Sequence, residues 1–194
     1  MNSYFDAVKS EMRNWKKAVL VIVFTVARII YGWSWLQAGW GKATTEGWLT
    51  NGKHNSYGLI AGMVKNMLPP KAHGLDPLHL NSLWAWVATH VFNGMPSLTD
   101  KLVICVEIAI GLLMIFGVKL FWTSILALFM NVQFITAGSG NNFGYIWTNI
   151  IIMNLANYAE LIGVSGYLKY RKGKELLGSK KLTASPAGGI GPRG

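Results

Sequence analysis

The amino-acid sequence predicts an all-α protein, an integral membrane four-helix bundle with a long, partly helical outer segment. Of its 194 residues, 52% are hydrophobic and 13% are charged, whereas a soluble domain carries about a quarter charged residues. The apolar residues also form four blocks, each about long enough to cross a ~30 Å hydrocarbon core as a helix. These blocks lie at residues 17–38, 101–117, 119–137 and 144–163.

The first block follows a basic cluster, and another basic cluster follows the fourth block. The first block is too long for a cleaved signal sequence and lacks a small-residue cleavage site, so we expect it to be retained. Because Lys and Arg concentrate on the cytoplasmic side, we expect a multi-pass protein of the cell membrane with both termini in the cytoplasm. The clusters also explain the net charge of +10 through contact with anionic lipid, without a nucleic-acid partner. They comprise Lys9, Arg13, Lys16 and Lys17 at one end, and Lys169, Arg171, Lys172, Lys174, Lys180 and Lys181 at the other.

With this topology, residues 39–100 lie outside. Residues 57–68 have helical apolar spacing and end at two prolines, and residues 80–92 are a second, more apolar helix too short to span. We expect both helices to lie on the membrane surface or over the mouth of the bundle. Residues 97–100 read Ser-Leu-Thr-Asp, which resembles a capping box at the start of the second span.

Residues 1–178 are expected to form one membrane domain. The connections at residues 117–119 and 138–142 are short, so successive spans should be antiparallel neighbours. Residues 179–194 are rich in Gly, Pro and small residues and are expected to form a flexible tail.

Two charged residues lie inside apolar blocks, Arg28 in the first and Glu107 in the second. A charge at bilayer depth costs several kcal/mol unless it is paired or hydrated, so such residues mark a functional site or a buried ion pair. Counted from the outer ends of their spans, Arg28 lies ~15 Å deep and Glu107 ~10 Å deep. We therefore expect the two side chains to interact, and both the structural and the functional interpretation stay open.

Asparagines occupy the third and fourth blocks, including Asn131 and Asn149. The polar residues of the fourth block fall on one face of a helix. Side chains on that face either form interhelical hydrogen bonds, worth about 0.6 kcal/mol each, or line a wet cavity.

The sequence offers little for metal or thiol chemistry. Its only cysteine, Cys105, cannot form an intramolecular disulfide or ligate an iron–sulfur cluster alone. The four histidines lie in residues 39–100 without the spacing of a metal motif. We therefore expect neither haem nor metal in this chain.

Three motifs carry a resemblance to a known family. Residues 28–42 read RIIYGWSWLQAGWGK, residues 107–117 read EIAIGLLMIFG, and residues 140–145 read GNNFGY. Across residues 18–167 the chain resembles the DoxX/DoxD family, and its long outer segment is closer to the DoxD branch. The resemblance implies the membrane subunit of a thiosulfate:quinone oxidoreductase, which joins two thiosulfates into tetrathionate and passes two electrons to quinone beside a small DoxA-type subunit.

The resemblance and the residues together suggest a candidate site. Arg28 and Lys42 would attract anionic thiosulfate, and Glu107 would relay protons to quinone. A quinone ring suits a pocket with tryptophan walls and a few polar groups. The expected lining residues are Trp33, Trp35, Trp84, Asn131 and Asn149, with Trp86 beside Trp84 in the lid. The alternative function is a non-catalytic accessory subunit that docks or stabilises a respiratory complex such as a terminal oxidase.

Overall fold

The computed structural model describes residues 3–72, 74–139 and 143–177, and every regular element in this part of the chain is helical. The all-α prediction is therefore confirmed. The expected tail at residues 179–194 and residues 140–142 of the expected turn at 138–142 lie outside the described residues.

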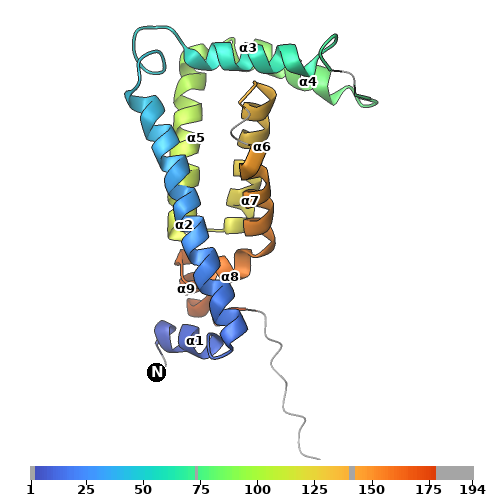
Figure 1. The fold of residues 1–194 in the computed structure, drawn as a ribbon. Helices are drawn as coiled ribbons and strands as arrows, with labels where there is room; N and C mark the ends of the chain where they lie inside the picture. The colour runs from blue at the N-terminus through green and yellow to red at the C-terminus, as the bar shows by residue number, and fades with distance from the viewer. Residues whose placement is uncertain (1–2, 73, 140–142, 178–194) are drawn as a thin grey trace, which may run out of the picture.

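The longest element is α2 (Trp15–Thr44), which packs along α5 (Pro96–Phe116) in the opposite direction (Figure 1). Asn14 caps α2 by accepting hydrogen bonds from the backbone of Lys16 and Lys17. A Cβ atom on Gly32 would lie 2.8 Å from the Gly111 carbonyl oxygen. The missing side chains let the two backbones touch, as small residues do in close helix pairs.

A second pair stands beside the first. It consists of α6 (Leu120–Thr136) and α7 (Phe143–Asn154), which pack against each other (Figure 1). The expected fourth helix at residues 144–163 is wrong in one respect, because it is interrupted at Leu155 and continues as α8 (Ala156–Leu161). Leu155 has φ −107° and ψ 19°, outside the helical region.

One end of the two pairs is covered by α3 (Asn55–Met67), α4 (Leu80–Val87) and the π-helix η1 (Ala88–Phe92) (Figure 1). This confirms that residues 39–100 are partly helical. Trp84 fixes α4 over α6 by donating a 2.8 Å hydrogen bond from Nε1 to Gln133 Oε1.

The expected capping box at residues 97–100 is wrong. Pro96 begins α5 after Met95, and no side chain caps this helix. The Asp100 carboxylate instead accepts from the Ser56 backbone N–H at 3.0 Å and contacts His54 Nδ1 at 2.8 Å. Asp100 is fully buried, so it serves the otherwise unpaired start of α3 rather than its own helix.

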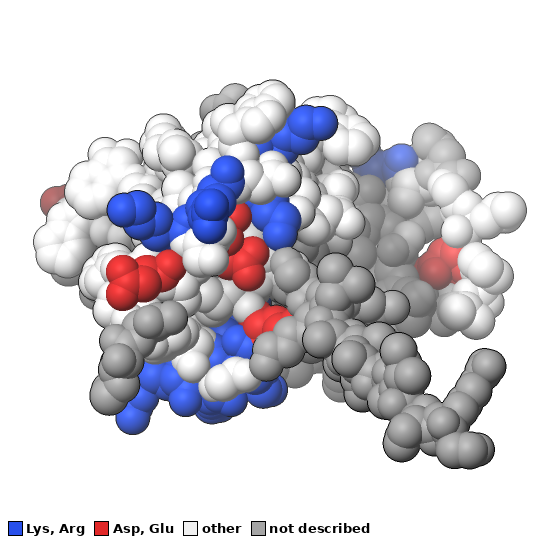
Figure 2. All heavy atoms as spheres, turned by 90° about the horizontal axis from the view of Figure 1, so that it is seen from below, with Lys and Arg blue, Asp and Glu red and all other residues white. Residues whose placement is uncertain are grey.

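At the opposite end, α1 (Tyr4–Glu11) lies near α8 and α9 (Val164–Arg171). The Tyr4 hydroxyl donates to the carbonyl oxygen of Leu161. Burial raises the pKa of this hydroxyl, which favours the protonated, donating form. Figure 2 looks onto this end and shows many basic side chains with a few acidic ones between them.

Large apolar side chains remain exposed along α2, α5, α6 and α7. Among the described residues, α2 is the one helix long and apolar enough, by length and composition, to cross a membrane. Its most apolar stretch is only 28% buried within the protein. The 21-residue α5 is long enough to span but carries three charged residues, Asp100, Lys101 and Glu107.

Candidate functional site

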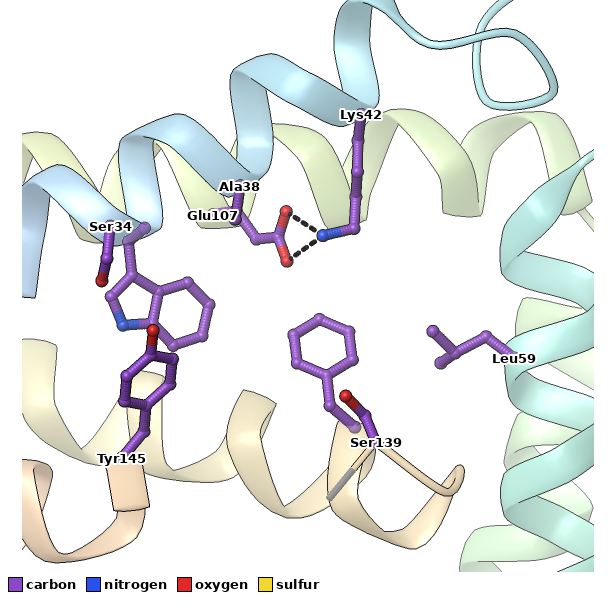
Figure 3. Close-up of a pocket in the computed structure, with 9 residues that line it drawn as sticks. Ser34, Ala38, Lys42, Leu59, Glu107, Ser139 and Tyr145 are labelled. Atoms are coloured by element: carbon purple, nitrogen blue, oxygen red, sulfur yellow. Dashed lines mark hydrogen bonds and ion pairs between the residues drawn. The ribbon is translucent and has the colours of Figure 1, made fainter. Parts of the chain in front are cut away.

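A cavity of ≈ 360 Å³ lies between the two helix pairs, beneath α3. Aromatic rings and a few polar groups make up its wall. Figure 3 shows Lys42 reaching from α2 toward Glu107, with Leu59 and Tyr145 on other sides of the space. The lining residues are Ser34, Trp35, Ala38, Lys42, Leu59, Glu107, Phe134, Ser139 and Tyr145.

Lys42 and Glu107 form the charged feature of this cavity. Lys42 Nζ lies 2.7 Å from both carboxylate oxygens of Glu107. The pair forms because α2 and α5 touch at Gly39, where a Cβ atom would lie 2.8 Å from Ile108 Cγ1. The Glu107 side chain is 1% exposed and that of Lys42 is 21% exposed. The pair is therefore an almost buried, charge-neutral unit with its ammonium toward the cavity.

Aromatic rings further hold the Lys42 ammonium. It lies 5.3 Å from the ring centre of Phe134 and 5.5 Å from that of Trp48. Cation–π contacts of this length add about 0.5–2 kcal/mol each. Lys42 is thus a positioned hydrogen-bond donor, but most of its charge is already balanced by Glu107.

A buried polar cluster adjoins the cavity wall. Asn131 Nδ2 donates a 3.0 Å hydrogen bond to the Tyr31 hydroxyl, and the Tyr31 ring packs 5.2 Å from that of Tyr145. Trp35 and Asn149 also interact with the Tyr31 hydroxyl, and Asn131 Oδ1 is buried without a hydrogen-bond partner among the described residues. Since an unpaired buried polar group costs about 1–3 kcal/mol, Asn131 Oδ1 can accept a hydrogen bond from a bound polar group or water.

Arg28 does not belong to the cavity, and its expected contact with Glu107 is wrong. Its guanidinium donates to the carbonyl oxygens of Met114 and Ile115 at 2.5 Å. It also donates to those of Ala159 and Ile162, at 2.8 and 2.5 Å. No carboxylate among the described residues forms an ion pair with it.

The physical reason is the register of the helices. Both α2 and α5 extend past the apolar blocks, so depths counted from the block ends were wrong. The contact of Gly32 with Gly111 places Arg28 level with Met114 and Ile115. Glu107 lies about two helical turns, ~11 Å, farther along α5.

The tryptophans expected in the pocket separate into three environments. Trp35 lines the cavity and is 4% exposed. Trp33, on the other side of α2, is 54% exposed and does not line it. Trp84 lines a neighbouring apolar groove, and Trp86 is exposed on α4. The expected tryptophan wall therefore reduces to one side chain.

Several cavity residues had not been expected. Ser34, Leu59, Phe134 and Tyr145 are common residues of apolar segments, and no sequence spacing distinguishes them. Tyr31 was detectable in principle, because it lies one turn from Trp35 on the face that carries Arg28.

Within the three described ranges, no group of three His, Cys, Asp or Glu side chains is placed to hold a metal ion. In comparisons with protein-family models, curated proteins and solved structures, nothing matches the chain.

Proposed function

We propose that the chain is a four-span subunit of a quinone-linked membrane oxidoreductase, and that the cavity at Lys42 and Glu107 receives the quinone ring. The observation that carries this proposal is the pairing of an ammonium donor and a buried carboxyl group inside an aromatic cavity. The spans are α2, α5, α6 and the α7–α8 pair. Both termini lie in the cytoplasm, and α3 and α4 lie on the outer side.

The distribution of exposed side chains supports the membrane assignment. Apolar residues of this size and number would form an aggregation-prone patch in water but suit contact with lipid. A core helix of a soluble protein would be mostly buried, whereas only 28% of the most apolar stretch of α2 is buried. The exposed apolar side chains include Val19, Ile22, Val26 and Ile30 on α2, Leu102, Leu112 and Phe116 on α5, Phe121, Ile125 and Phe129 on α6, and Trp147 and Ile151 on α7.

The cavity chemistry supports the quinone. Its volume lies within the usual range for small-molecule sites, and such sites combine apolar walls with few polar groups. Lys42 is placed to donate a hydrogen bond to one quinone oxygen. Glu107 holds a proton-accepting carboxyl group beside Lys42. When bound, a quinone takes up two electrons and two protons and becomes a quinol.

The resemblance supplies the electron donor, since two thiosulfate ions release two electrons when they join as tetrathionate. Arg28 cannot bind the thiosulfate anion in the cavity, because its guanidinium is bound to backbone carbonyl oxygens. Lys42 is the remaining cation at the cavity, and Glu107 already balances it. Thiosulfate oxidation therefore belongs to the assembled enzyme, with anion binding completed by a partner such as a small DoxA-type subunit.

Substitutions at the ion pair test the proposal. In membranes with thiosulfate as donor, Glu107→Gln should slow quinone reduction about 100-fold, within the range for loss of an acid–base group. Lys42→Ala should weaken the binding of a short-tail quinone about tenfold, as expected for a lost charged hydrogen bond. Lys53→Ala, an exposed lysine at the same end, is the matched control and should behave as wild type.

Wild-type binding and turnover in both cavity variants would contradict the proposal. Because Lys42→Ala leaves Glu107 buried without its partner, the double variant Lys42→Ala/Glu107→Gln is needed as well. If the double variant restores folding but not quinone binding, the loss is functional rather than structural.

The accessory-subunit function has its own supporting observation. Both cations inside the helical bundle already serve the fold, Arg28 through carbonyl oxygens and Lys42 through Glu107. A subunit that only stabilises a respiratory complex needs nothing more. Stable copurification with a large oxidase, together with no quinone binding by the purified chain, would favour this function.

A further inference from the structure

A second hollow lies next to the cavity, between α3, η1, α5 and α6. It measures ≈ 90 Å³, and its exposed lining is entirely apolar. A space of this size and composition suits a narrow flexible hydrocarbon chain and disfavours a polar ring. We call this space the apolar groove. Its lining includes Leu59, Ile60, Met63, Trp84, Ala88, Phe92, Leu102, Val103, Phe129, Met130 and Phe134.

The apolar groove adjoins the cavity. Leu59 and Phe134 line both spaces, so these two side chains form the partition between them. On the cavity side, Phe134 contacts the Lys42 ammonium. A molecule with a polar head beside Lys42 and an apolar tail would reach the apolar groove when the Leu59 and Phe134 side chains move apart.

The other end of the apolar groove meets the exposed apolar surface. Two of its lining residues, Leu102 on α5 and Phe129 on α6, are 44% and 45% exposed. Both helices expose further apolar side chains on either side of these positions. Trp84 forms the roof at this end, because its ring packs edge-on to Phe129 and its Nε1 is held by Gln133.

We propose that the apolar groove holds the isoprenoid tail of a membrane quinone whose ring lies in the cavity. This inference rests on the proposed function and names the ligand as a long-tail quinone that enters sideways from lipid. The tail passes between Leu59 and Phe134 and leaves the protein between Leu102 and Phe129. The apolar walls of the groove contact the tail by dispersion, and burial of the tail adds to affinity.

Two quinones that differ only in their tails test this inference. The binding of a tail-free quinone and of its analogue with two isoprene units is measured on the purified chain in nanodiscs. Leu102→Trp narrows the lipid end and should weaken the long-tail analogue about tenfold, the equivalent of two buried methylene groups. The tail-free quinone should bind the variant as it binds the wild type. Because each ligand is compared between variants, partitioning into the lipid cancels.

Leu112→Trp is the matched control. It makes the same change on the same helix at a similarly exposed position, 41%, that does not line the apolar groove. Both ligands should bind this control as they bind the wild type. A diazirine at the end of the long tail should in addition label peptides that contain Leu102 or Phe129.

The outcomes separate the two proposals. If the tail-free quinone binds but Leu102→Trp leaves long-tail binding unchanged, or if the diazirine labels other peptides, the groove inference fails and the proposed function stands. Binding of neither quinone to the wild type overturns both. Labelling of the same peptides by a phospholipid with a diazirine acyl chain, undiminished by excess long-tail quinone, shows that the groove holds a lipid instead.

Discussion

At the scale of single residues, Arg28 is a helix cap made by a charged side chain from another helix. Its guanidinium accounts for terminal carbonyl groups of both α5 and α8. Such groups have no partners within their own helices and carry the partial negative charge of the helix dipole. A planar fork of donors can serve several of them together, which a lysine cannot do. The charge is therefore balanced by backbone dipoles together with the charge of the Glu160 carboxylate, which does not contact Arg28 directly.

Gly117 makes room for this cap and provides a prediction. It has φ +66°, and a Cβ atom there would lie 2.9 Å from Arg28 Cζ. Gly173 has nearly the same backbone, φ +64°, with no heavy atom within 4 Å of such a Cβ. Gly173→Ala should cost only the left-handed strain, about 1–2 kcal/mol. Gly117→Ala should cost about 2 kcal/mol more, because it also displaces a buried charge from its partners.

Thermal unfolding in detergent, followed by circular dichroism, compares the two variants with the wild type. Equal losses of melting temperature would show that Arg28 adjusts without cost. The capping role assigned to Arg28 would then be wrong.

At the scale of elements, three glycines set the register of α2 against α5. Gly32 and Gly111 touch through their backbones, and Gly39 contacts the backbone of Ile108. These contacts fix which side chains can meet across the interface. They bring Lys42 to Glu107 and hold Arg28 two turns away, so the ion pair in the cavity depends on close approach of the two helices.

A pair of substitutions in one helix tests this dependence. In Gly32→Ala the new Cβ would lie 2.8 Å from both the Gly111 carbonyl oxygen and Met114 Cβ, so the helices must separate. We expect a loss of about 1–3 kcal/mol, typical of overpacking. Gly41 has no neighbour within 4 Å, so Gly41→Ala should be neutral or stabilising by about 0.5–1 kcal/mol. Chemical or thermal unfolding of both variants measures the difference, and destabilisation of equal size would refute the register argument.

The sequence was sufficient for much of the helical layout. Residues 119–137 correspond to α6, and residues 80–92 correspond to α4 with η1. Helix ends were less accurate wherever polar residues continue an apolar helix, as in the last turns of α2. The break at Leu155 could not be predicted, since no Pro or Gly marks it and the neighbouring Asn154 and Asn157 only weakly disfavour a helix.

The candidate site was predicted in part. Lys42, Glu107 and Trp35 were expected in one place, and the structure brings all three to the cavity. Arg28 was wrongly placed because its depth was counted from the end of its own apolar block. Such a count does not include the contact between Gly32 and Gly111, which determines the residues of α2 and α5 that lie at the same level. Tyr31 and Phe134 were missed because their importance arises from packing between helices that are distant in sequence.

At the scale of the whole molecule, the two ends of the helical bundle differ. One end is covered by α3 and α4, and the other carries more basic residues. The cavity lies at the end covered by α3 and α4 (Figure 1). At the other end the basic residues outnumber those at the covered end. The α1–α9 end carries Lys9, Arg13, Lys16, Lys17, Lys119, Lys169, Arg171, Lys172 and Lys174, and the covered end carries Lys42, Lys53, Lys65, Lys71 and Lys101.

This asymmetry predicts which end of the protein faces the cytoplasm. Because short basic segments are retained on the cytoplasmic side, Lys172 should lie inside and Lys53 outside. Both positions are exposed, and the single native cysteine can be removed as Cys105→Ala. In that background, an impermeant thiol reagent added to intact cells should label Lys53→Cys. It should label Lys172→Cys only after the membrane is opened.

The opposite pattern would invert the protein and place the cavity on the cytoplasmic side. Quinone binding would survive such an inversion, because the apolar groove opens toward lipid at the level of Leu102 and Phe129. The side from which the electron donor arrives would change, since α3 and α4 would then face the cytoplasm. Labelling of both cysteines in intact cells would contradict the four-span arrangement itself, because three spans, α5, α6 and the α7–α8 pair, separate Lys53 from Lys172 and put them on opposite sides.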